Sequence, residues 1–147
     1  MNLFGVMDVS GSALMAERLR AEVVASNMAN AETTRTPEGG AYRRQHVVFQ
    51  SQAPELSNFA DHFRSESDGD IGGVEISAVV SDKDTGLRRY DPQHPDADKD
   101  GYVSYPDINP LTEMVDLMGA TRAYGLNSSA VQATKSMISS SLDILKS

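Results

Sequence analysis

Small and apolar residues near the start of the chain recur at steps of three and four, the spacing of one helix face. Glycines at 5 and 11 weaken the first turns, because glycine costs about 1 kcal/mol inside a helix. Residues 36–40, Thr-Pro-Glu-Gly-Gly, then break the pattern. We therefore expect a helix over about residues 6–30, with one face formed by Val6, Val9, Ala13, Ala16, Leu19, Val23, Asn27 and Asn30.

A longer pattern runs to the C-terminus. Asn109 is a suitable N-cap and Pro110 suits the first helical position, where its missing N–H is no loss. Glu113 and Asp116 suit the positive end of the helix dipole. The pattern predicts a helix over residues 110–146, about 55 Å long at ~1.5 Å per residue. So long a helix in so small a chain favours a coiled coil or an assembly.

This predicted helix carries two apolar stripes. The first, called the seam below, steps like a heptad repeat of mixed quality; it comprises Met114, Leu117, Thr121, Tyr124, Ser128, Val131, Lys135, Ile138, Leu142 and Leu145. The second lies one position back: Ala120, Ala123, Asn127, Ala130, Thr134, Met137 and Ile144. Packing of the two terminal helices in one domain would cover only part of so broad a face. Exposed apolar area of this kind marks an interaction surface.

The middle of the chain has a different character. Residues 42–50 and 73–80 are rich in β-branched or aromatic residues and partly alternate, which predicts two strands. Residues 51–72 are largely polar, and we expect a short amphipathic turn there at Leu56, Phe59 and Phe63. Residues 81–107 are interpreted as an ordered loop. The predicted fold is mainly α with a small β region: an N-terminal helical segment (1–36), a β and loop region (37–108) and a long C-terminal helix (109–147).

Composition and motifs exclude several classes of function. The net charge is −8 and the 13 basic residues are scattered, whereas nucleic-acid binding needs clustered Lys and Arg. The chain has no Cys, no run of about 20 apolar residues that would span a membrane, and no secretory signal pattern in its first 17 residues. Because catalytic motifs are missing and His46, His62 and His94 share no ligand spacing, we expect no enzyme, cofactor or metal site.

Residues 96–107, Asp-Ala-Asp-Lys-Asp-Gly-Tyr-Val-Ser-Tyr-Pro-Asp, resemble an EF-hand calcium loop. Asp107 is one methylene shorter than the usual bidentate Glu, and Pro106 stands where the exiting helix should be running. Pro92 and Pro95 exclude the entering helix. These departures favour a turn-rich acidic loop without a calcium role. The alternative function for the chain is a monomeric calcium-binding regulator, which calorimetry with calcium would test. The calcium ligands would be Asp96, Asp98, Asp100, the Tyr102 carbonyl, Ser104 and Asp107.

Two sets of motifs carry a family resemblance. The first set lies in the N-terminal segment: residues 26–33, Ser-Asn-Met-Ala-Asn-Ala-Glu-Thr, together with residues 10–14 and 17–20 upstream, which fit the same family pattern. Residues 90–107 contain Tyr-Asp-Pro, His-Pro-Asp-Ala-Asp, Gly-Tyr-Val and Tyr-Pro-Asp, followed by Glu-Met-Val-Asp at 113–116, matches at 120–124 and 127, and Thr-Lys-Ser-Met at 134–137. Together they resemble the axial proteins of the bacterial flagellar rod and hook. The resemblance covers residues 1–50 and 74–147.

The resemblance implies a structural subunit of the flagellar rod rather than an enzyme. It implies terminal helices in a coiled-coil-like layer around an export channel, a β region on the outside, and export without a cleaved signal to a periplasmic rod. Partners would be further copies, other rod proteins, and the junction to the export apparatus and MS ring. We expect subunit packing through Val9, Ala13, Ala16, Val23, Asn27 and Asn30, and through Met114, Leu117, Tyr124, Val131, Ile138 and Leu142.

Overall fold

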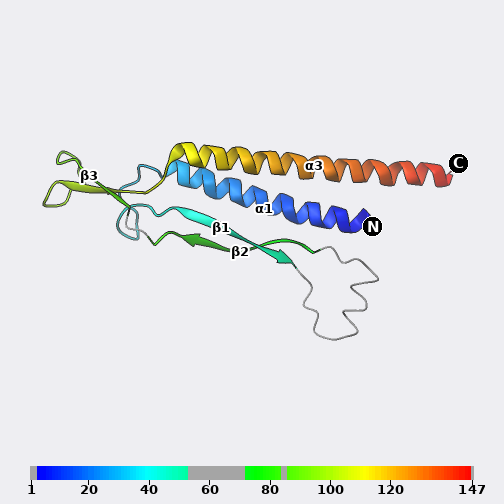
Figure 1. Ribbon diagram of the computed structural model, residues 1–147, viewed down its shortest axis with the longest axis horizontal. Helices are drawn as coiled ribbons and strands as arrows, with labels where there is room; N and C mark the ends of the chain where they lie inside the picture. The colour runs from blue at the N-terminus through cyan, green and yellow to red at the C-terminus, as the bar shows by residue number, and fades with distance from the viewer. Residues whose placement is uncertain (1–2, 53–71, 84–85, 147) are drawn as a thin grey trace, which may run out of the picture. The chain divides into compact units, whose positions relative to one another are not determined.

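The computed structural model describes residues 3–52, 72–83 and 86–146 (Figure 1). Its elements are α1 (Leu3–Ala29), β1 (Gln45–Gln52), β2 (Gly73–Ser81), β3 (Leu87–Tyr90), β4 (Tyr102–Tyr105) and α3 (Pro110–Lys146). Along the chain, a long helix at each end thus flanks a short β-rich insert, which confirms the predicted fold class. The amphipathic turn expected at Leu56, Phe59 and Phe63 lies outside the described residues.

The start of α3 is fixed by the cap that the sequence predicts. The Leu111 N–H donates to Asn109 Oδ1 at 3.0 Å, and the Glu113 N–H donates to the Asn109 carbonyl at 3.1 Å. The Asn109 side chain thus supplies an acceptor for one N–H of the first turn that the helix leaves without one, and the Asn109 carbonyl accepts the first bond of the helix itself. The helix then continues without a break to Lys146.

Helix α1 starts at Leu3, three residues before the predicted position, and contains both Gly5 and Gly11. At its other end, the Ser26 carbonyl accepts from the Asn30 N–H at 3.1 Å and from the Asn30 side chain, through Nδ2, at 2.9 Å. The chain then turns at Gly39 and Gly40, whose φ angles of 94° and 81° favour glycine.

The strands form two separate two-stranded sheets, β1 with β2 and β3 with β4. In the antiparallel β3–β4 sheet, Leu87 lies opposite Tyr105 and Tyr90 lies opposite Tyr102. The interpretation of residues 81–107 as a loop without strands was therefore wrong. Each of these strands has only four residues, too few for an alternating pattern to stand out. Gly86 precedes β3 with a φ of 79°, and a Cβ there would lie 2.2 Å from the Tyr105 carbonyl oxygen.

The chain divides into two compact units, one of Met1–Arg18, Phe49–Ser77 and Thr121–Ser147 and another of Leu19–Val48 and Ala78–Ala120. Among the described residues of the first unit, small side chains are buried: Ser10, Ala16 and Thr134. The second unit buries larger and more polar side chains: Val23, Val24, Asn27, Val103, Ile108 and Glu113, together with Ala120. The polar members of this second set form the network described next.

Candidate functional site

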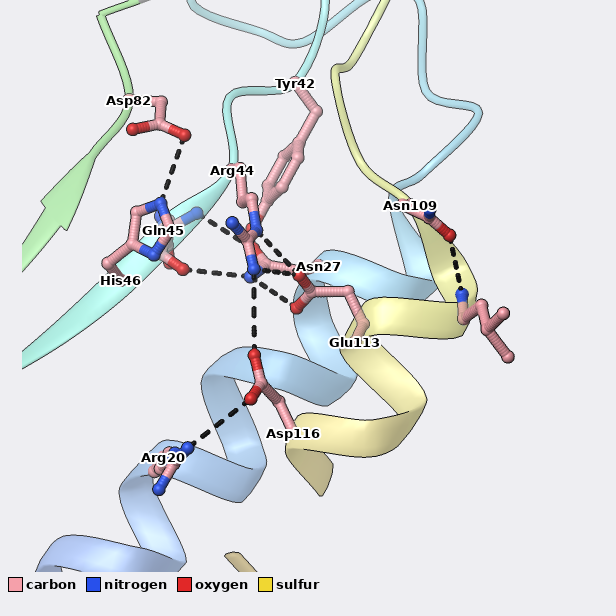
Figure 2. A network of polar contacts seen from close by, with 11 residues as sticks. Arg20, Asn27, Tyr42, Arg44, Gln45, His46, Asp82, Asn109, Glu113 and Asp116 are labelled. Atoms are coloured by element: carbon pink, nitrogen blue, oxygen red, sulfur yellow. Dashed lines mark hydrogen bonds and ion pairs between the residues drawn. The ribbon is translucent and has the colours of Figure 1, made fainter. Parts of the chain in front are cut away.

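A buried carboxylate lies in the first turn of α3. Glu113 is only 1% exposed. Arg44 Nε donates to its Oε1 at 2.6 Å, Arg44 Nη2 contacts the same oxygen, and Asn27 Nδ2 donates to Oε2 at 3.1 Å (Figure 2). Both carboxylate oxygens therefore have charged or polar partners, which a buried charge requires. The contacts join α3 to α1 and to the residue that precedes β1.

Arg44 is held by more than Glu113. Its Nη2 lies 3.8 Å from Asp116 Oδ2, and Arg20 Nη2 of α1 lies 3.5 Å from the other oxygen of Asp116. The backbone carbonyl of Arg44 accepts from the Asp82 N–H at 2.8 Å, just beyond β2. Asp82 also contacts His46 of β1, with 3.1 Å between Oδ2 and Nε2. These contacts orient the guanidinium toward the start of α3 (Figure 2).

Asn27 uses both ends of its amide group. Its Nδ2 donates to the Gln45 carbonyl at 2.9 Å as well as to Glu113, while its Oδ1 accepts from the Gln45 N–H at 2.9 Å and from the Tyr42 hydroxyl at 3.2 Å. With two donors and two acceptor positions used, this 1% exposed side chain is fully satisfied. Asn27 therefore binds β1 as a neighbouring strand would.

The network contains acidic and basic side chains, and they bind one another and the backbone. The Glu113 carboxylate is covered and bonded on both oxygens. We define Asn27, Tyr42, Arg44, Gln45 and Glu113 as the polar junction. Its hydrogen bonds hold the last turns of α1, the start of β1 and the first turn of α3 together within the second unit. Among the described residues, no group of three or more His, Cys, Asp or Glu side chains is arranged to hold a metal ion.

Two carboxylates of the acidic loop 96–107, those of Asp96 and Asp98, bind groups of the same chain. Asp98 Oδ1 accepts from the Asp100 N–H at 2.9 Å and from the Tyr102 N–H at 3.0 Å, and its Oδ2 pairs with Arg88 of β3. Asp96 accepts from the Thr34 hydroxyl at 2.8 Å and lies 3.7 Å from Arg35. Strand β3 precedes the loop where the entering helix of an EF-hand would lie, and β4 lies within it. Helix α3 begins only at Pro110, after the loop has ended.

Acidification is expected to loosen this loop at Asp98. The Tyr102 N–H, then the Asp100 N–H and Arg88, favour the ionised carboxylate and hold the pKa of Asp98 below its ordinary value of 3.8. A lowered folded-state pKa stabilises the loop above the ordinary value, and this stabilisation is lost as the pH falls through the lowered one. The amide shift of Tyr102, followed by NMR, should therefore titrate below 3.8, and Asp98→Asn should abolish the titration. A midpoint above the ordinary value would contradict the assignment.

The structure distributes the residues expected to pack between subunits over several environments. On α1, Ala16, Val23 and Asn27 are buried, while Val9, Ala13 and Asn30 are partly buried. On α3, Leu117, Val131 and Ile138 are partly buried. The other three, Met114, Tyr124 and Leu142, are 49%, 45% and 52% exposed.

Burial along α3 follows the second stripe more closely than the seam. Ala120 and Thr134 are buried, and Ala123, Asn127 and Ala130 are partly buried. Thr134 donates its hydroxyl to the Ala130 carbonyl at 2.9 Å, so its buried oxygen has a partner. The contacts of α3 within the chain therefore leave much of the seam at the surface.

Sequence reasoning assigned Glu113 to the helix dipole and gave no role to Arg44 or Tyr42. Arg44 and Glu113 are 69 positions apart, so no local periodicity connects them. One signal was present: Arg44 lies within the predicted strand 42–50, where a charged residue needs a partner if it is covered.

Comparison with known proteins gives the family. Residues 7–35 match the model of flagella basal body rod proteins, and residues 99–144 match that of the C-terminal part of flagellar basal body rod FlgEFG proteins.

No helix in the described part of the chain combines the length and apolar character needed to cross a membrane.

Curated relatives cover nearly the whole chain. The chain is 42% identical to the flagellar basal-body rod protein FlgC of Borreliella burgdorferi over 99% of both chains. It is 41% identical to FlgC of Bacillus subtilis over 99% of this chain and 100% of the relative, and 35% identical to FlgC of Salmonella typhimurium over 98% of both. The chain therefore belongs to the FlgC family of flagellar basal-body rod proteins.

Proposed function

We propose that the chain is a non-enzymatic structural subunit of the proximal rod of a bacterial flagellar basal body. Family membership supports a rod protein. The observation that carries the assembly role is the exposed part of the α3 seam, where Met114, Tyr124 and Leu142 are about half exposed. Side chains of this size at a surface gain free energy when a neighbour covers them, about 25 cal/mol per Å² of apolar area.

In this proposal, the seam is covered by helices of neighbouring subunits. Val9, Ala13, Ala16, Val23 and Asn27 pack against α3 within the subunit and in neighbours, and small residues among them let helix axes approach closely. Asn30 closes the end of α1 through its bond to the Ser26 carbonyl. The segments 1–36 and 109–147 form the helical layer of the rod, and residues 37–108 lie on its outside.

We further propose that a polar face of α3 lines part of the export channel. Gly125, Ser129, Gln132, Ser136, Ser139 and Asp143 recur at steps of three and four, and all are exposed. They lie two positions beyond the stripe of buried residues, which places them nearly opposite it on a helix. Ser129 and Ser136 donate their hydroxyls to carbonyls of their own helix at 2.9 and 3.0 Å. Such a surface offers few apolar contacts to a passing unfolded chain.

Family membership is also the support for the remaining parts of the proposal. The subunit reaches the periplasm without a cleaved signal, and its partners are further copies of itself, other rod proteins, and the junction to the export apparatus and MS ring. Torque passes through many helix contacts at once, so no single contact needs to be strong.

Photo-crosslinking tests the seam directly. Replacing Tyr124 by the similarly shaped benzoylphenylalanine should give ultraviolet-dependent adducts with rod proteins or a second copy in purified basal bodies. Tyr90, which is exposed on β3, is the matched control because the β region is assigned to the outside. Adducts with rod proteins at position 90 and none at position 124 would overturn the assignment.

A further inference from the structure

One serine hydroxyl joins α1 to the start of β2 within the first unit. Ser12 Oγ donates to the Val9 carbonyl at 2.8 Å and accepts from the Val74 N–H at 3.0 Å. A hydroxyl has a single hydrogen, so donation to Val9 leaves its lone pairs to face Val74. The helical turn formed by residues 9–12 sets this orientation.

Gly73 brings β2 against α1 at the same point. A Cβ at this position would lie 2.6 Å from Ser12 Oγ, 3.2 Å from Ser12 Cβ and 3.2 Å from Gln52 Oε1. The φ angle of Gly73 is not positive, unlike those of Gly39, Gly40, Gly86 and Gly101. The strand therefore needs glycine here for space rather than for backbone conformation.

We propose that Ser12, Gly73 and Val74 form a latch that makes the position of β2 conditional on the helical state of α1. Without the helical turn at residues 9–12, the Ser12 hydroxyl has no fixed orientation and the Val74 N–H loses its acceptor. Without glycine at position 73, the strand cannot come close enough to make the bond. The first half of α1 and the start of β2 therefore order together.

Hydrogen exchange of the full chain, followed by NMR, tests the latch at the Val74 amide. Val74 should be protected in the unchanged chain and should exchange roughly tenfold faster in Ser12→Ala, the effect of losing one hydrogen bond. Gly11→Ala is the matched control: the added methyl group meets no atom within 4 Å and alanine favours the helix, so exchange at Val74 should not become faster. The buried Val103 of the second unit is the reference amide and should be unaffected. An unprotected Val74 in the unchanged chain, or equal acceleration at Val74 and Val103, would overturn the proposal.

Two further variants separate the close approach from the coupling. Gly73→Ala should also speed exchange of the Val74 amide, because its methyl group clashes with the Ser12 side chain. Adding Ser12→Gly to Gly73→Ala removes this clash. In the double variant, the β2 amides should therefore return toward the protection seen in Ser12→Gly alone. Ala13→Pro breaks the turn at residues 9–12, because its ring clashes with the Val9 carbonyl and disfavours helical backbone at Ser12, yet it leaves the Ser12 side chain unchanged. It should release Val74 at least as strongly as Ser12→Ala. Continued protection of Val74 while the α1 amides exchange freely would refute the coupling.

Discussion

Replacing Glu113 by alanine is expected to lower the free energy of unfolding by about 3–5 kcal/mol, since removing one partner of a buried ion pair leaves the other charge uncompensated. Glu113 is 1% exposed and takes bonds from Arg44 and Asn27. In the Glu113→Ala chain, the ion pair left to Arg44 within the described residues would be the one with Asp116, at 3.8 Å, although the Arg44 side chain is itself 25% exposed. Because domains are stable by only about 5–15 kcal/mol, this loss is a large fraction of the total. Urea titration followed by circular dichroism measures it.

Asp116→Ala is the matched control for this experiment. Asp116 lies one turn further along the same helix and faces the same guanidinium, but its side chain is 39% exposed. An exposed pair contributes about 0–1 kcal/mol, so the control should unfold almost as the unchanged chain does. In a double-mutant cycle, Arg44→Ala combined with Glu113→Ala should cost less than the sum of the single changes. Equal losses for Glu113→Ala and Asp116→Ala would show that burial of the network contributes nothing.

Val131→Asp is expected to abolish swimming. Val131 is already partly buried within its chain and belongs to the seam, which we propose neighbouring subunits cover. An aspartate there would place an unpaired charge in a helix layer, at a cost of several kcal/mol per ion. Because every copy in the rod would carry the change, the loss is repeated at each contact. Soft-agar motility assays measure the outcome, with an immunoblot to show that the chain is made.

Ser136→Asp is the control for added charge. Ser136 is exposed on the proposed channel face, where Asp143 already places a carboxylate. This variant should swim. Normal swimming of Val131→Asp would show that the seam is not a packed surface, and loss of swimming in both variants would show that charge alone is responsible.

The ends of the chain were predictable because their signals are local. The Asn109 cap and the proline after it define where α3 begins to within one residue, and continuous three–four spacing carries the helix to its end. In the middle, β1 and β2 begin or end within a few residues of the predicted strands. Strand β3 was missed because its four residues, which include Arg88 and Arg89, give no apolar alternation, and β4 was missed because four residues are too few for a pattern to stand out.

The polar junction could not be derived from the sequence, because its hydrogen bonds join residues that are 15 to 86 positions apart along the chain. Asn27 was expected on the packing face of the N-terminal helix, whereas its side chain reaches across to the backbone of Gln45. Which of two neighbouring stripes of α3 turns inward also depends on the partner surface. Both stripes have comparable apolar content, and only the fold decides that Ala120 and Thr134 are covered while Tyr124 and Leu142 are not.

The most direct test of the account is mass spectrometry of detergent-extracted, alkali-washed flagellar basal bodies. If the chain is an axial subunit, it should remain with the basal body through these washes, together with other rod proteins. Its absence from washed basal bodies, with the chain recovered elsewhere as a soluble monomer, would contradict a rod function. The exposed seam of α3 would then need another explanation.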